Sequence, residues 1–366
     1  MGAGLTRLIG DRPGVLAAVH AAEGLFEETR TPVCGRAVWL TTWFETHPAA
    51  QPLAVAVETG RRLAGLGVFE MTRRGPLRTI TLAAAGPSDH GRLPARDAEA
   101  AAALADGIVD LLRGLPRPWR LRLAQLPHDD PVAAALAGAL PGARLRPGQG
   151  CPQLAFGADR VLDRHISASG RRAVRQSRSR LARAGVDVRM ERVRDLAAIR
   201  RLLPAVIALR RDRDHAVGRR SDLDDEAGRL FYIRVVCRLA ETGAVELPTL
   251  WLDDRLATYL LAFRDGATVR NWDGRISSGW PHVSLGPLLR AEWIGALLAE
   301  PGPAGVDWMR GELPHKMQAA THVVGAQHLL AESSPLVRAA QRRSAGLRRV
   351  ARTAIPDRLR CRLRTR

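Results

Sequence analysis

The most reactive candidate in this chain of 366 residues is its only lysine. The chain contains 55 arginines besides this one lysine, which ends the string Asp307-Trp-Met-Arg-Gly-Glu-Leu-Pro-His-Lys316. An ammonium is a compact point charge whose pKa moves on burial, whereas a guanidinium is a wide planar fork that stays charged. We therefore expect Lys316 to stand where an arginine cannot replace it. The alternative is that one lysine is left by chance in an arginine-rich composition.

Two arginine clusters could bind phosphate groups. The first has no acidic residue between Ser167 and Gly185 and contains Arg171, Arg172, Arg175, Arg178, Arg180 and Arg183. The second covers residues 335–366, where eleven arginines accompany one acid, Asp357, and supply about half of the net charge of +19. Such clusters attract nucleic acid, anionic lipid or a phosphorylated cofactor. A solvated face in an arginine-rich protein is the alternative.

Bulk properties limit the classes of protein. The length favours about two domains, and a hydrophobic content of 46% is too high for a disordered chain. No apolar run reaches the ~18 residues of a membrane span. The four cysteines are far apart and form no CxxC motif, which argues against a zinc site and for a reducing cytoplasm. We expect a bacterial, cytoplasmic protein.

The elements that would position these residues follow one order in the first half. Apolar residues have helical spacing in residues 1–30, and Trp39 and Trp43 are four apart, so they share one helix face. Strands, helices and turns then alternate. The strands are predicted at 52–57, 63–71, 80–85 and 119–126, and the helices at 95–112 and 131–140.

The second half repeats this order. Helices are predicted over 168–184, 195–211 and 224–242, and strands over 247–252, 256–263, 268–273 and 305–309. The string Ser284-Leu-Gly286-Pro287 is predicted to begin a further helix, because proline suits a first helical turn. This helix is expected to end near residue 299. A loop over 311–316 follows the last strand.

A short internal match links the two halves. Arg62-Leu63-Ala64 follows the first acidic hairpin turn, and Arg255-Leu256-Ala257 follows the second. Residues 141–152 are rich in glycine and proline, which is typical of a linker. Together these features indicate two similar α/β domains in tandem.

Four features of the second half carry a resemblance to a known family. They are the Ser/Arg-rich opening at 169–181, the hairpin turn before Arg255, the pair Asp273-Gly274 followed by Ser284-x-Gly286, and the closing Asp307-(x)3-Gly311-Glu312-(x)2-His315-Lys316. This order of elements and motifs resembles the GNAT acyltransferases, and more closely their double-domain CelD/FemABX-like branch. Family members usually show Gly-x-x-x-Tyr-Lys, so Lys316 falls on the family's lysine and His315 replaces its tyrosine.

The resemblance implies an α/β (α+β) fold of tandem GNAT-like domains, with mixed central sheets flanked by helices. It implies an N-terminal GNAT-like domain at 1–150, a CelD-like acyltransferase domain at 151–334 and a basic tail at 335–366. The donor would lie where two central strands splay apart. Backbone N–H groups would polarise its acyl carbonyl, and a helix N-terminus would hold the pyrophosphate of coenzyme A.

Site residues follow from the same resemblance. The catalytic candidates, which include groups that could accept the acceptor's proton, are Lys316, His282, His315 and Asp273. The candidates for binding the cofactor are Ser284, Gly286, Arg275, Arg171 and Arg175. No metal is expected.

Three functions stay open at this point. The first is transfer of an acyl group, such as acetyl, from acyl-CoA to an amine or hydroxyl of a small-molecule, sugar or cell-envelope acceptor. The second is FemABX-like transfer from aminoacyl-tRNA, with tRNA as the partner. The third is a non-catalytic GNAT-like scaffold, held peripherally at an anionic membrane through 335–366.

Overall fold

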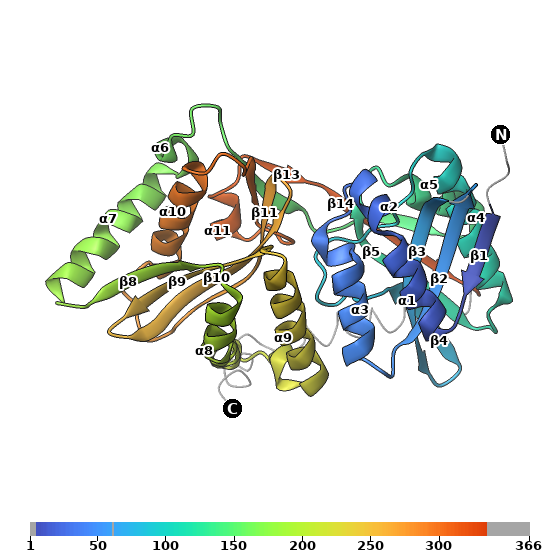
Figure 1. Cartoon of the computed structure of the whole chain (residues 1–366), viewed down its shortest axis with the longest axis horizontal. Coiled ribbons are helices and arrows are strands. Elements are labelled where there is room, and N and C mark those ends of the chain that lie inside the picture. The colour runs from blue at the N-terminus through green and yellow to red at the C-terminus, as the bar shows by residue number, and fades with distance from the viewer. Residues whose placement is uncertain (1–4, 61, 335–366) are drawn as a thin grey trace, which may run out of the picture. The chain divides into compact units, whose positions relative to one another are not determined.

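Two α/β units make up the chain (Figure 1). The computed structural model describes residues 5–60 and 62–334. One unit contains the described residues up to Gln149 and those from Gly325 onward, and the other contains Gly150–Val324. Each unit is built on a mixed sheet of seven described strands. The predicted architecture of two α/β domains with mixed sheets is therefore confirmed.

The first sheet has the strand order β1-β2-β3-β4-β5-β14-β6. Its strands are β1 (Leu5–Ile9), β2 (Gln51–Thr59), β3 (Arg62–Arg74), β4 (Leu77–Leu82), β5 (Trp119–Pro127), β14 (Ala326–Glu332) and β6 (Arg144–Pro147). Among the described strands of this sheet, only the β4–β5 pair is parallel.

The prediction of helix throughout residues 1–30 was wrong at its start. Residues Leu5–Ile9 form the edge strand β1, which pairs antiparallel with β2. Leu5 and Leu8 are 60% and 50% exposed, so their spacing does not follow a buried helix face. The helical pattern begins only after Asp11, whose side chain accepts from the Gly14 N–H and caps the first helix.

Helices cover both faces of the first sheet. One face carries α1 (Arg12–Ala21), α2 (Glu23–Glu28), the short 3-10 turn η1 (Val33–Gly35) and α3 (Ala37–Thr46), and the other carries α4 (Ala98–Gly114) and α5 (Pro131–Ala139). Along β2, Val55 packs into the α4 cluster and Ala54 into the α1–α3 cluster. Both faces are buried, which explains why β2 reads as one apolar run without polar alternation.

The second sheet has the order β13-β7-β12-β11-β10-β9-β8. Its strands are β13 (His322–Val324), β7 (Cys151–Ala155), β12 (Gly305–Asp307), β11 (Thr268–Ile276), β10 (Arg255–Asp265), β9 (Val245–Leu252) and β8 (Val188–Val193). Here β11 and β12 form the one parallel pair among described strands. Read from β8, this order repeats the first sheet read from β1, and the matched strings at Arg62 and Arg255 begin the equivalent strands β3 and β10.

Helices also flank the second sheet (Figure 1). On one side lie α8 (Leu196–Ala216) and α9 (Glu226–Glu241), joined by the 3-10 turn η2 (Asp222–Asp224), and on the other lie α7 (Ala168–Arg183) and α10 (Leu285–Leu298). Two short helices, α6 (Leu162–His165) and α11 (Pro314–Met317), complete the unit. The apolar face of α10, including Ile294 and Leu297, packs on β11 and β12 through Val269 and Val306.

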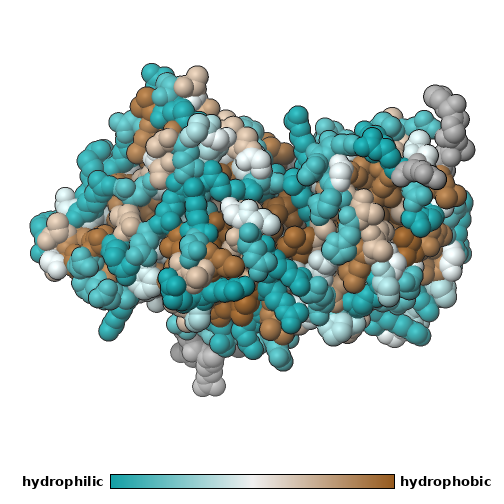
Figure 2. Space-filling view, in the orientation of Figure 1, coloured by the Kyte–Doolittle hydropathy of each residue, from teal (hydrophilic) through white to brown (hydrophobic). Residues whose placement is uncertain are grey.

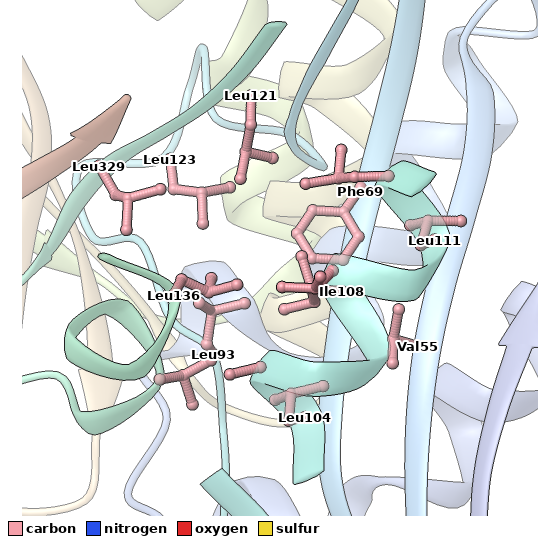
Figure 3. Packing of buried hydrophobic residues seen from close by; sticks show 14 of the residues in the cluster. Val55, Phe69, Leu93, Leu104, Ile108, Leu111, Leu121, Leu123, Leu136 and Leu329 are labelled. Carbon is pink, nitrogen blue, oxygen red and sulfur yellow. The ribbon is translucent and has the colours of Figure 1, made fainter. Parts of the chain in front are cut away.

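The two sheets exchange one strand each. Although β6 and β7 are consecutive in the chain, β6 belongs to the first sheet and β7 to the second. Likewise β13 belongs to the second sheet, whereas the next strand, β14, belongs to the first. Residues 325–334 were assigned to the second domain, and this was wrong because β14 pairs with β5 and β6. Its Leu329 packs near Leu123 and Leu136 in the first core (Figure 3). The predicted linker at 141–152 contains β6 and the start of β7.

No helix in the described residues is long and apolar enough to cross a bilayer. The face shown in Figure 2 is mostly hydrophilic, with smaller hydrophobic areas between polar side chains. The basic tail at 335–366 lies outside the described residues. Within the described part of the chain, Cys34, Cys151 and Cys237 form no disulfide.

Candidate functional site

The candidate site begins where β11 and β12 part. The two strands pair at only three positions, and the last joins Arg270 to Asp307. Beyond that point β12 has ended, whereas β11 continues to Ile276. The register between β10 and β11 also slips between Leu261 and Ala262, which leaves Trp272 as an extra residue in β11. Bulges of this kind bend a strand and increase its twist, and they are common beside active sites.

A cleft of about 280 Å³ opens in this gap. Its wall includes the end of β11, the first turns of α10 and the segment after β12. The lining residues are Thr258, Tyr259, Leu260, Asn271, Trp272, Asp273, Gly274, Arg275, Ile276, Gly286, Leu289, Arg290, Trp308, Leu313, His315 and Lys316. We call this cavity the central cleft.

Asp273 forms the centre of a buried polar network at the central cleft. Its Oδ2 accepts hydrogen bonds from the hydroxyl of Tyr259 at 2.8 Å and of Tyr232 at 3.0 Å. Arg275 donates to Oδ1 at 2.7 Å, and Arg210 lies 3.3 Å from Oδ2. Burial alone would raise the pKa of Asp273, but the two guanidiniums and the phenols hold it below its ordinary value. The carboxylate is therefore ionised and fully engaged, which favours an anchoring role over that of a proton acceptor.

The tyrosines and Arg275 complete this network. Burial, together with the Asp273 charge, raises the pKa of Tyr232 and Tyr259, so both phenols stay protonated as donors. The Arg275 guanidinium also donates from Nε to Asp214 on α8 at 3.1 Å. Arg275, predicted to bind cofactor, thus lines the cleft with its charge shared between two carboxylates.

Lys316 and His315 enter the central cleft from α11. The predicted loop at 311–316 is in part this short helix. Lys316 Nζ donates to the carbonyl of Arg310 at 2.7 Å and lies 3.4 Å from that of Met309. Partial burial lowers the pKa of His315, and the charges of Arg290 and Lys316 lower it further. The imidazole is therefore neutral near pH 7 and able to accept a proton.

The start of α10 supplies the glycine of the predicted Ser284-x-Gly286 motif. Ser284 is the N-cap residue, and its N–H donates to Ser177 Oγ at 3.0 Å. Gly286 lines the cleft, and a Cβ there would lie 2.8 Å from Ile276 Cδ1. Glycine therefore permits this close approach of helix and strand. Leu285 N–H is already bonded to the Val283 carbonyl, and Pro287 has no N–H.

A second cleft of about 250 Å³ adjoins the first between α10 and α11. It shares Ile276, Arg290 and His315 with the central cleft. The rest of its lining is largely apolar and consists of His165, Ile166, Ser167, Gly170, Pro287, Ala291, Ile294, Gln318 and Ala319. We call it the apolar cleft.

The structure divides the predicted site residues into two groups. Five of them line the central cleft, namely Asp273, Arg275, Gly286, His315 and Lys316, and Ser284 caps the adjoining helix. Three others, His282, Arg171 and Arg175, line neither cleft. His282 is exposed and its carbonyl accepts from Arg180. Arg171 donates to the carbonyls of Asp163 and Ile166, and Arg175 is exposed.

Several site residues carried no signal that the sequence analysis used. They are Arg210, Asp214, Tyr232, Tyr259, Asn271 and Arg290. Arg290 could have been found from helix geometry, because it stands four residues after Gly286 and so shares its helix face. Asn271 Oδ1 is buried without a hydrogen-bond partner among the described residues, directly after the last β11–β12 pair. Within the described residues, no three His, Cys, Asp or Glu side chains gather to hold a metal.

The two units share one strand order, and each has one parallel strand pair among its described strands. Residues 168–317 match the family described as Acetyltransferase (GNAT) domain. The second unit therefore carries a GNAT domain, as the sequence analysis predicted. No curated protein matches the sequence significantly.

Solved structures share the fold over most of this chain. FemX aligns with a TM-score of 0.58 at 10% identity, over 88% of this chain and 96% of its own. L-PGS from Bacillus licheniformis aligns with a TM-score of 0.51 at 12% identity, over 90% and 95%. A tandem GNAT protein from the clavulanic acid biosynthesis pathway aligns with a TM-score of 0.50 at 16% identity, over 90% and 99%. At these identities the likeness is one of fold.

Proposed function

We propose that this protein is a GNAT-type acyltransferase acting in the central cleft. It would transfer an acyl group, such as acetyl, from acyl-CoA to an amine or hydroxyl of a small-molecule, sugar or cell-envelope acceptor. The observation that carries the proposal is the parting of β11 and β12, with two adjoining clefts at the gap. The apolar cleft offers room for the arm of the donor, and the central cleft for its acyl carbon and the acceptor.

The proposed chemistry uses groups that line the central cleft. Neutral His315 accepts the proton of the acceptor amine or hydroxyl as that atom bonds to the acyl carbon. The carbon–sulfur bond of the thioester breaks, and the thiolate leaves. Backbone N–H groups of β11 beyond Arg270, which no longer face β12, stabilise the negative oxygen that forms. Lys316 supplies a fixed positive charge beside the same carbon.

A second donor is favoured by the surface of α7. Arg172, Arg175 and Arg183 are exposed along this helix, and no acid stands between Ser167 and Gly185. This surface suits a phosphate backbone, so FemABX-like transfer from aminoacyl-tRNA is the second candidate. In the third candidate, a non-catalytic scaffold, the clefts would bind neither donor.

One experiment separates the three candidates. Purified protein would be titrated with acetyl-CoA, longer acyl-CoAs and charged tRNA, and its unfolding temperature measured. A ligand at about 100-fold excess over its Kd stabilises the folded state by about 2.7 kcal/mol. Transfer of a labelled acyl group to a panel of amines and amino sugars would be followed in parallel. Stabilisation and transfer with acyl-CoA support the proposal, whereas those effects with charged tRNA alone would support the second candidate.

Lys316→Ala provides the matched control for this experiment. If labelled product forms at the same rate with this variant, the transfer does not occur at the central cleft. Wild-type protein that responds to none of these donors would contradict both enzymatic candidates and leave the scaffold.

A further inference from the structure

The described lining of the central cleft contains more basic than acidic side chains, namely Arg275, Arg290 and Lys316 against Asp273. Asp214 and Asp273 are each paired with Arg275, and both also lie within 4.0 Å of Arg210. Two carboxylates thus compensate two guanidiniums at the floor of the cleft. The other permanently charged side chains in its lining are Arg290 and Lys316.

Arg290 has no carboxylate partner among the described residues. Its Nη1 donates to the carbonyl of His315, and its guanidinium lies over the ring of Trp308, 5.4 Å from the centroid. Burial lowers the pKa of Arg290, and no acidic group offsets this effect. This differs from Arg210 and Arg275, whose pKa values nearby carboxylates raise.

A guanidinium withdrawn from water without a counter-ion is costly to a folded protein. Elsewhere in this unit, half-buried Arg192 and Arg264 both pair with Glu246 and Glu300. Arg160, which lines neither cleft, instead donates to four backbone carbonyls. Arg290 is also the one described residue of α10 that lines both clefts. Its position is therefore that of a group whose partner is a ligand.

We propose that Arg290, with Lys316 beside it, binds an oxyanion of the ligand in the central cleft, either a carboxylate or a phosphate. The proposal rests on the proposed function in one respect, because the ligand is taken to be a substrate of transfer. The oxyanion can come from two sources, a phosphate of the donor or an acid group of the acceptor. A planar guanidinium held on Trp308 retains N–H donors besides the one given to His315, and carboxylate and phosphate accept such donors in pairs.

Binding of inorganic phosphate tests the proposal without any need for turnover. Isothermal titration would compare wild-type protein with Arg290→Gln and Arg290→Lys at constant ionic strength. The matched control is Arg201→Gln, which removes an exposed arginine of α8 away from both clefts. We expect Arg290→Gln to weaken binding by about 10- to 100-fold. Arg290→Lys should restore part of this loss, and the control should bind as the wild type does.

A second pair of titrations identifies the source of the oxyanion. Coenzyme A and pantetheine share one arm, but only coenzyme A carries phosphate. If the donor supplies the oxyanion, Arg290→Gln weakens coenzyme A far more than pantetheine. If the acceptor supplies it, both affinities are unchanged, and carboxylate-bearing amines lose their preference over the corresponding amides in transfer assays.

Failure of this proposal is distinguishable from failure of the proposed function. Equal phosphate affinity in Arg290→Gln and Arg201→Gln would overturn the oxyanion site, even if acyl transfer proceeds. Loss of phosphate binding in Arg290→Gln alone would support the site, even if no donor yields product.

Discussion

Arg270 and Asp307 form an ion pair of 2.5 Å at the last position that joins β11 to β12. Asp307 is fully buried and also accepts from the N–H of Met309 at 2.8 Å. Met309 has a positive φ of 61°, so the chain turns away from β11 directly after this pair. The ion pair thus stands at the apex of the central cleft.

Replacing Asp307 with alanine should destabilise the protein strongly. The change removes a buried carboxylate that pairs with Arg270 and that accepts from the N–H of Met309. Breaking a buried pair of this kind costs about 3–5 kcal/mol, and urea unfolding would measure it. Asp110→Ala is the control, because its exposed pair with Arg113 contributes less than about 1 kcal/mol. Similar losses in both variants would contradict the structural role of Asp307.

Lys316→Ala should abolish transfer with little loss of folded structure, and Lys316→Arg should be nearly as harmful. Nζ reaches the carbonyls of Arg310 and Met309 as a compact ammonium, and a planar guanidinium cannot occupy the same space. Steady-state kinetics with circular dichroism as the fold check would measure both effects. An arginine variant with near wild-type kcat would show that any positive charge suffices.

His315→Ala should lower kcat by about 10²-fold if this residue accepts the proton. His282→Ala should change kcat little, because His282 lines neither cleft. If both variants lose a similar factor in kcat, the position of His315 in the cleft does not identify it as the proton acceptor.

Transfer should also depend on pH in one direction. The neutral imidazole of His315 is the active form, so the rate should rise as pH increases through its lowered pKa and level off near neutrality. Since the charge of Arg290 contributes to that lowering, Arg290→Gln should move the acid limb of kcat/KM toward higher pH. An unmoved limb would exclude His315 as the titrating group.

Truncation after Ser334 should preserve turnover on a soluble acceptor and abolish salt-sensitive binding to anionic vesicles. The removed segment carries eleven arginines and one acid, and each basic residue near an anionic leaflet contributes about 1 kcal/mol. Vesicle sedimentation at low and high salt would measure binding. Equal binding by the full and truncated chains would show that the tail is only a solvated extension.

The tandem architecture was predictable because its signals are local. The matched strings at Arg62 and Arg255 each begin the strand after a hairpin turn, and both strands occupy the same place in their sheets. By contrast, β14 pairs with residues of β5 that precede it by about 200 positions, such as Gln327 with Leu126. No local periodicity carries the identity of so distant a partner.

Part of the site was also predictable from local sequence motifs. The motifs around Asp273, Gly286 and Lys316 converge because Asp273 lies on β11, Gly286 follows β11, and Lys316 follows the neighbouring strand β12. Arg290 was missed because one arginine among 55 carries no signal by itself. Its distinguishing property is that it pairs with no carboxylate of the described residues, and this depends on side chains that only folding brings together.

The strand exchange has a consequence for synthesis on the ribosome. Among the described strands, β6 pairs only with β14, which is one of the last described segments to be translated. Translation of residues 150–324, at about 5–20 residues per second, takes roughly 10–35 s. During that interval the first sheet ends at β5, whose open edge could pair with another chain. The nascent first unit is therefore the stage at which this protein is most exposed to aggregation and most dependent on chaperones.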